Sequence, residues 1–206
     1  MRLSNQRYEE IKEMIADIYE DYDINSFPIN VDSLSQKLNI SFKFESQVKD
    51  RFSKKELPVF ACALTDYSSM EHKVLIADKT SNEYRQNFSK CHEIGHLILG
   101  HKKAEAIEEA EANFFASYLL APSCLVLVPE VGQYLIDNYW VIPFIFDISL
   151  DAAEVVYSRF IHRQSCEEKI KPYENRIIDI LGESLINKIK QIMKNKKGGD
   201  QLIFDF

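Results

Sequence analysis

The segment His92–His101, with the sequence HEIGHLILGH, holds the residues of this chain best suited to metal-assisted chemistry. On a helix, positions i and i+4 share a face, so His92 and His96 can reach the same ion. Glu93 lies on a neighbouring edge, where its carboxylate can touch a water on that ion. Two neutral imidazoles with one position left for water suit a catalytic Zn²⁺, which lowers the pKa of bound water to about 7. The motif therefore indicates metal-assisted hydrolysis.

A bare HExxH motif also occurs by chance, as a pair of ordinary surface histidines, so its surroundings matter. The positions between and after the histidines are apolar and contain no proline: Ile94, Leu97, Ile98 and Leu99. Residues 84–91 can continue the same helix toward the N-terminus, with Ser81 or Asn82 as the N-cap, and Gly100 is a reasonable end. The sequence thus predicts a helix that holds both histidines rigidly.

A catalytic zinc site normally has three protein ligands, and the next segment, 105–121, predicts a second helix that a proline ends. Its inward face is expected to consist of small and apolar residues: Ala112, Phe115, Ala116, Leu119 and Leu120. Glu105, Glu109 and Asn113 stack four apart beside that face. Glu109 is therefore the expected third ligand, and Asn113 is expected to orient a ligand. In the alternative, the glutamates form a solvated charge run, which is the expectation for Glu105 and Glu108.

Taken together, HEIGH and the later E-A-E-A-N-x-F-A-x-x-L-L-x-P resemble the ImmA/IrrE family of metallopeptidases. The similarity spans roughly Asn82 to Pro122, and it is weaker over 27–40 and 146–153. The chain departs from the family at Cys91, where Ala is common, and at Ala121, where Met is usual. Neither departure removes a chemical group that the reaction requires.

The resemblance implies a gluzincin-like site with one Zn²⁺ per chain. Its ligands would be His92, His96 and Glu109, with Glu93 as the general base. The residue that would stabilise the oxyanion stays open, and the candidates are Tyr84, Arg85, Tyr118 and His101. His101 follows a glycine and is expected to cap the helix end rather than to bind the metal.

The resemblance further implies a cytoplasmic endopeptidase that cuts a regulatory protein, typically a helix-turn-helix repressor in phage, mobile-element or stress circuits. Two other functions stay open. The helical part after Pro122 could bind and sequester a repressor or DNA, with a metal site that serves structure only. The chain could also be the toxin of a toxin–antitoxin pair.

Composition limits the partners and the compartment. The chain has 206 residues and a net charge of -7, which argues against a phosphate-tracking surface and direct nucleic-acid binding. Its four cysteines are scattered without a CxxC pair, as in a cytosolic protein with reduced thiols. No apolar segment follows Met1, and the longest apolar run, Trp140–Phe146, is too short to cross a bilayer. We therefore expect a cytoplasmic protein with no membrane contact.

The expected fold class is α+β, with a small three-stranded sheet packed on helices in a zincin-like core and a helical part behind it. We expect a metallopeptidase domain over 1–125, a helix-turn-helix-like part over 126–197 and a flexible tail over 198–206. Outside the two motif helices, helices are predicted over 5–22, 31–38, 124–139, 150–163 and 173–194, and strands over 40–44, 58–66 and 72–77. Ser68 and Ser69 would join the last two strands as a hairpin. The second strand or its partner could pair with an extended peptide.

Overall fold

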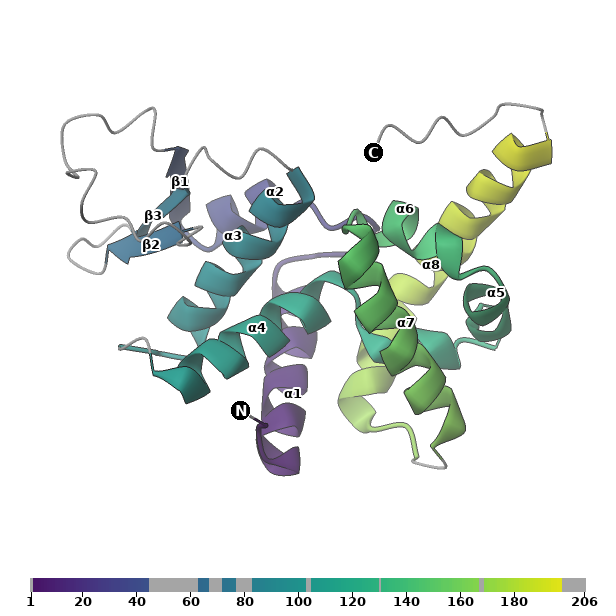
Figure 1. Cartoon of the computed structure of the whole chain (residues 1–206), viewed down its shortest axis with the longest axis horizontal. Coiled ribbons are helices and arrows are strands. Elements are labelled where there is room, and N and C mark those ends of the chain that lie inside the picture. The colour runs from purple at the N-terminus through teal and green to yellow at the C-terminus, as the bar shows by residue number, and fades with distance from the viewer. Residues whose placement is uncertain are drawn as a thin grey trace. The chain divides into compact units, whose positions relative to one another are not determined.

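The structure is a computed structural model that describes residues 2–44, 63–66, 72–76, 83–102, 105–129, 131–166 and 169–197. Most of these residues are helical (Figure 1). They form two compact units, the first made of Met1–Tyr22 and Asn30–Ala121 and the second of Asp23–Ile29 and Pro122–Phe206. The short segment 23–29 therefore belongs to the same unit as residues that follow it by a hundred positions.

Side-chain caps start the first two helices of the first unit. Helix α1 (Asn5–Asp21) begins after Ser4, whose hydroxyl accepts a hydrogen bond from the backbone N–H of Arg7. Helix α2 (Val31–Lys37) begins after Asn30, whose side chain caps it in the same way. The apolar stripe of α1 is buried, as its helical spacing predicts: Ile11, Ile15, Ile18 and Tyr19.

Three short strands follow in the first unit. β1 (Ile40–Phe44) pairs in parallel with β3 (His72–Ile76), and β2 (Ala63–Asp66) pairs with β3 in the antiparallel sense. The order β1-β3-β2 puts β3 in the middle and β2 at an edge. The predicted strand ranges run on into residues 58–62 and Ala77, and the predicted Ser68–Ser69 loop lies in 67–71. All of these lie outside the described residues.

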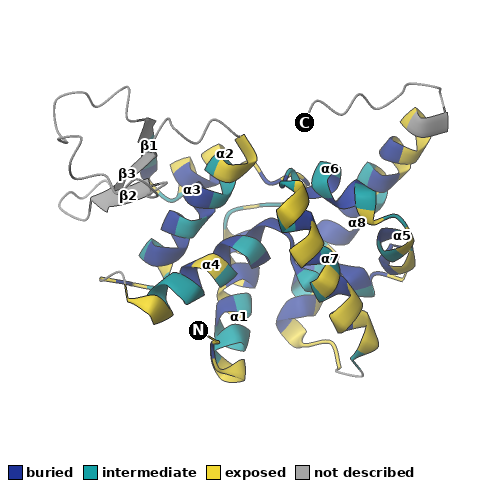
Figure 2. Cartoon of the chain, in the orientation of Figure 1, coloured by how far each residue is buried: buried dark blue, intermediate teal, exposed yellow. Residues whose placement is uncertain are grey.

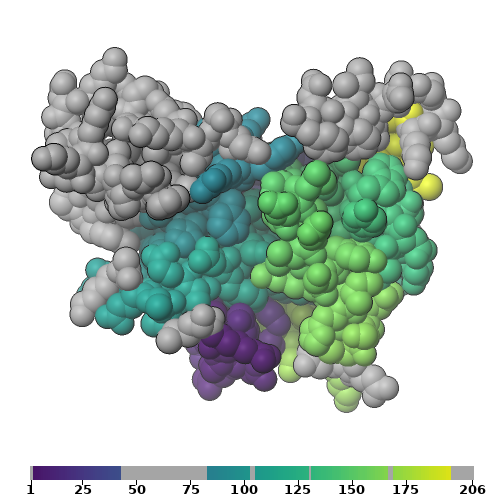
Figure 3. All heavy atoms as spheres, viewed as in Figure 1, coloured from purple at the N-terminus to yellow at the C-terminus, as the bar shows by residue number. Residues whose placement is uncertain are grey.

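Helices α3 (Glu83–Ile98) and α4 (Ala106–Leu120) pack closely on each other. A Cβ atom on Gly95 of α3 would lie 2.9 Å from Cδ1 of Phe115 on α4, so any larger residue here would require the ring or the helices to shift. Every residue predicted for the inward face of α4 is buried (Figure 2). The other side of α4 contacts α1 (Figure 3), where the Tyr19 hydroxyl donates to the carbonyl of Leu119.

The second unit corrects one prediction, because the single helix expected over 124–139 is wrong. The chain forms three short pieces instead, the 3₁₀-helices η2 (Ser123–Leu127) and η3 (Tyr139–Val141) with α5 (Gly132–Asp137) between them. Pro129 has no N–H to donate to a helix. The chain also turns back so tightly that a Cβ on Gly132 would lie 1.8 Å from the carbonyl oxygen of Val126.

The remaining helices of the second unit are α6 (Ile142–Phe146), α7 (Leu150–Ser165) and α8 (Pro172–Lys197). Arg163 of α7 and Glu174 of α8 form a buried ion pair of 2.6 Å. The predicted apolar stripe of α8 is buried: Ile177, Leu181, Leu185, Ile189 and Ile192. The predicted tail, 198–206, lies outside the described residues. Among the described helices, none combines the length and the apolar character needed to cross a membrane.

Candidate metal centre

Two histidines of α3 and one glutamate of α4 converge at a single point in the first unit. His92 Nε2 and His96 Nε2 lie 3.0 Å apart. The carboxylate of Glu109 lies 3.4 Å from His92 Nε2 through Oε2 and 3.5 Å from His96 Nε2 through Oε1. One ligand atom from each residue lies within 4.8 Å of the others. Sequence reasoning put these three side chains together, and the structure brings them together.

The spacing and chemistry of these atoms fit a zinc ion. Four ligands held tetrahedrally at 2.0–2.1 Å from zinc are about 3.3 Å from one another, which is close to the separations seen here. Two imidazole nitrogens and a carboxylate oxygen are also a donor set that zinc prefers. A cation at this point would interact favourably with all three side chains at once.

Burial keeps the two imidazoles in their neutral form. Desolvation lowers the pKa of His92 below its ordinary value, although Glu109 and a side-chain hydrogen bond with Asn113 act in the opposite direction. The pKa of His96 is lowered too, first by burial and then by the neighbouring His92. Neutral imidazoles keep a lone pair for a metal, so the electrostatics agree with the geometry.

Glu93 and Cys91 flank the first histidine on α3. Glu93 is buried, and its negative charge raises the pKa of His96 against the effect of burial. Its carboxylate is not part of the convergent group of three. Cys91 is a free thiol, fully buried, and burial raises its pKa to about 12. A thiol so hard to ionise is a poor nucleophile, so the chemistry falls to the other side chains.

The acidic start of α4 divides its side chains between separate tasks. Glu108 accepts hydrogen bonds from the backbone N–H groups of Lys102 and Glu105, and it thereby caps the helix. Glu105 is exposed at the N-cap position. The expectation that these two form a solvated run therefore overlooked their capping role. Glu109, one turn after Glu105, is the glutamate that lies close to His92 and His96.

The remaining candidates lie in different surroundings. Asn113 hydrogen bonds to His92, one turn along α4 from Glu109. Tyr84 and Arg85 lie in the exposed first turn of α3, two turns before His92. Tyr118 is buried and lies nine residues after Glu109, half a rotation round the helix. Lys12 of α1 lies 5.9 Å from the centre of its ring. These positions do not identify which of the candidates would stabilise the oxyanion.

Gly100 and His101 end α3 in a way that returns the chain to the centre. Gly100 has a φ of 70°, and its N–H donates to the carbonyl of Leu97. The N–H of His101 donates to the carbonyl of His96 over 2.9 Å, which completes a Schellman motif. This turn folds the His101 side chain back so that its Nδ1 lies 2.9 Å from Nδ1 of His96. His101 therefore does more than end the helix as predicted, because its side chain also contacts His96.

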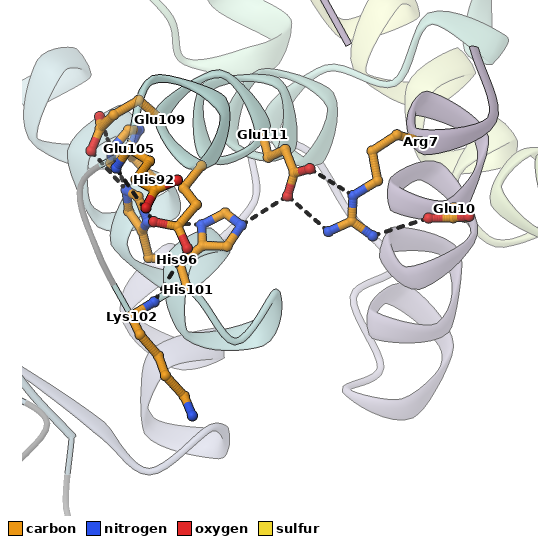
Figure 4. Close-up of polar contacts among 10 residues, drawn as sticks. Arg7, Glu10, His92, His96, His101, Lys102, Glu105, Glu109 and Glu111 are labelled. Carbon is orange, nitrogen blue, oxygen red and sulfur yellow. Dashed lines mark hydrogen bonds and ion pairs between the residues drawn. The ribbon is translucent and has the colours of Figure 1, made fainter. Parts of the chain in front are cut away.

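Two further residues, Glu111 and Arg7, extend the series of polar contacts beyond His101, and the sequence did not predict either of them (Figure 4). His101 Nε2 lies 2.8 Å from Oε2 of Glu111 on α4. Arg7 of α1 donates to both oxygens of Glu111, each over 2.8 Å. Glu111 could have been suspected from its four-residue spacing to buried Phe115, because a carboxylate on an inward face needs a partner. Nothing in the sequence links it to an arginine 104 residues away.

One known protein family matches a region of the chain that contains His92, His96 and Glu109. A family model described as an IrrE N-terminal-like domain, Peptidase_M78, matches residues 20–138, more than half of the chain. The matched residues include α3 and α4 in full, and therefore both sequence motifs. Arg7 precedes the matched region. No curated protein matches the chain.

Proposed function

Since the chain belongs to the Peptidase_M78 family, with an IrrE N-terminal-like domain, we propose that it is a zinc-dependent endopeptidase of a zincin-like fold. The observation that carries the proposal is the convergence of His92, His96 and Glu109 within 4.8 Å. These residues would hold one Zn²⁺, and Glu93 would serve as the general base. Membership of this family supports a peptidase, and the group of two imidazoles and one carboxylate supports zinc as its metal.

The chain's own residues divide the chemistry between them. When bound, zinc supplies Lewis-acid polarisation of a carbonyl and a lowered pKa for water. Glu93, buried beside His92, accepts a proton from the attacking water and later delivers it to the leaving amine nitrogen. Glu93 and His96 are both buried, and the lower dielectric of buried surroundings strengthens the electrostatic interactions that guide this transfer.

The proposed substrate is an extended segment of a cytoplasmic regulatory protein. In the described sheet β3 is paired on both sides, whereas β1 and β2 lie at its edges. Of the two hairpin strands β2 and β3, β2 is therefore the better candidate to pair with a substrate backbone. The resemblance to ImmA/IrrE peptidases favours a helix-turn-helix repressor as that protein, with cleavage relieving repression.

Substitution of Glu93 by Gln tests the proposal, because it keeps the size of the side chain and removes its basicity. The zinc-loaded full chain is incubated with a library of unstructured peptides, and cleavage is read by mass spectrometry. We expect the wild type to cleave and Glu93→Gln to lose about a hundredfold or more in rate, with an unchanged zinc content. Glu105→Gln, the same change at an exposed cap, should keep the wild-type rate.

Cleavage by Glu93→Gln at the wild-type rate would contradict the assigned role. A wild type without peptidase activity, combined with tight binding to a repressor, would favour the sequestering function instead. A Glu93→Gln variant that still relieves repression in cells would point the same way.

A further inference from the structure

A chain of polar side chains, buried except for the half-buried Arg7 at its end, runs from the proposed metal centre to the first helix. His96 contacts His101, His101 contacts Glu111, and Glu111 contacts Arg7, with donor–acceptor distances of 2.8–2.9 Å throughout (Figure 4). The side chains of His101 and Glu111 are only 5% and 11% exposed. The three residues beyond His96 are not among the proposed ligands, and the proposed proton transfer does not use them.

With His101 neutral and Glu111 ionised, the hydrogen-bonding capacity of each group fixes the direction of this chain. An ionised carboxylate only accepts hydrogen bonds and a guanidinium only donates them, so Glu111 accepts hydrogen bonds from both His101 and Arg7. His101 must therefore carry its proton on Nε2, the atom that faces Glu111. In the neutral imidazole, Nδ1 of His101 is then a bare acceptor.

The proton position on His101 also determines the proton position on His96. The Nδ1 atoms of His101 and His96 lie 2.9 Å apart, so one of them must carry a hydrogen. Because Nδ1 of His101 is the acceptor, Nδ1 of His96 is the donor. The lone pair of His96 is then on Nε2, the atom that lies 3.0 Å from His92 Nε2 and 3.5 Å from Glu109.

We propose that His101, Glu111 and Arg7 are positioning residues, which hold His96 in the tautomer and orientation that present Nε2 to the metal. This inference rests on the proposed function for its purpose, although the tautomer itself does not depend on a bound ion. The Schellman turn at Gly100 supplies the geometry, because it folds His101 back over the last turn of α3. Arg7 supplies a fixed countercharge from outside the family match.

A purely structural role would explain the same contacts as a link between α1, α4 and the end of α3. The two roles differ in what they predict for the folded protein. A structural link changes stability and leaves His96 as it is. A positioning chain also determines which nitrogen of His96 is protonated and how tightly the protein binds zinc.

The test measures imidazole ¹⁵N chemical shifts in the metal-free full chain at neutral pH. Zinc affinity is measured separately with Zn²⁺ in competition with a chromophoric chelator. In the wild type we expect His96 to be protonated at Nδ1 and bare at Nε2. His101→Phe keeps a ring but removes both nitrogens, so His96 should lose this preference and zinc affinity should fall about tenfold or more.

Two further variants separate positioning from stability. His101→Asn offers an amide oxygen to Nδ1 of His96, and it should restore the tautomer and part of the affinity. His162→Phe makes the same change on α7, in the second unit, and should alter neither measurement.

Each outcome decides the proposal. A wild-type His96 protonated at Nε2 would overturn it, and this result needs no variant to fold. A folded His101→Phe protein with wild-type tautomer and zinc affinity would overturn it as well. A wild type with the expected tautomer but no zinc binding would refute the proposed function and still support the positioning chain.

Discussion

Glu109 and Glu111 show how position on a helix decides what a carboxylate does. The two residues are 200° apart round α4 at 100° per residue, so they face different neighbours. Glu109, with a side chain 44% exposed, faces the histidines of α3, whereas Glu111 faces Arg7 and His101. A run of acids at the start of a helix therefore contains a cap, a proposed ligand and a buried ion-pair partner.

The Glu111–Arg7 pair predicts how acid affects stability. The two hydrogen bonds from Arg7 are the largest influence on the pKa of Glu111 and lower it, against the effect of burial. A carboxyl whose pKa is lower in the folded state stabilises that state above the unfolded pKa, and this contribution is lost as the pH falls through the folded pKa. We expect Glu111→Gln to cost about 1–3 kcal/mol at neutral pH.

Urea unfolding at a series of pH values checks this expectation. The difference in unfolding free energy between wild type and Glu111→Gln should shrink as the pH falls below about 4.3, the ordinary pKa of a glutamate, and through the lower pKa of the folded state. Glu13→Gln, at an exposed position of α1, should show a small difference at every pH. A difference for Glu111→Gln that stays constant with pH would argue against an ionised, paired Glu111.

At the scale of elements, the close approach of α3 and α4 is what brings the histidines to the glutamate. Gly95 permits this approach, because its missing Cβ leaves room for the fully buried ring of Phe115. Gly95→Ala should therefore force the helices apart or displace the ring, at a cost of about 1–3 kcal/mol in unfolding free energy.

Gly182→Ala is the matched control for this substitution. On α8 the added Cβ would meet its nearest atom at 3.8 Å, which is ordinary van der Waals contact. There, alanine should be neutral or stabilising, because it is the better helix former. Thermal unfolding compares the two variants directly. Gly95→Ala with the stability of Gly182→Ala would contradict the account of this helix contact.

The motif helices could be predicted because helical periodicity and apolar spacing agree along α3 and α4. The predicted N-cap of α3, Ser81 or Asn82, lies outside the described residues. The same periodicity failed over 124–139, where Pro129 and the tight turn at Gly132 break the chain into short pieces. Helical periodicity predicts which face of a helix is buried, but it does not predict which residues of distant segments pack against that face. For this reason Glu109 could be proposed as a ligand from sequence, whereas Arg7, which meets α4 only through the tertiary fold, could not.

At the scale of the whole chain, the proposed site and its support lie within one unit. The three convergent residues, Glu93 and the positioning chain all belong to Met1–Tyr22 and Asn30–Ala121. The family match extends from residue 20 to 138 and so runs into the second unit. Substitutions in α7 and α8 are therefore suitable controls for zinc binding, because they change the chain outside the unit that holds the site.

The central claim is that His92, His96 and Glu109 together hold one zinc ion. The most direct test is the zinc content of the purified full chain, measured by mass spectrometry of the metal, for the wild type, His92→Ala and Glu109→Ala. We predict about one zinc ion per wild-type chain, little or none in either variant, and a full complement in Glu105→Ala, one turn away from Glu109. Retention of zinc by a folded Glu109→Ala variant, or a wild type that binds none, would contradict the claim.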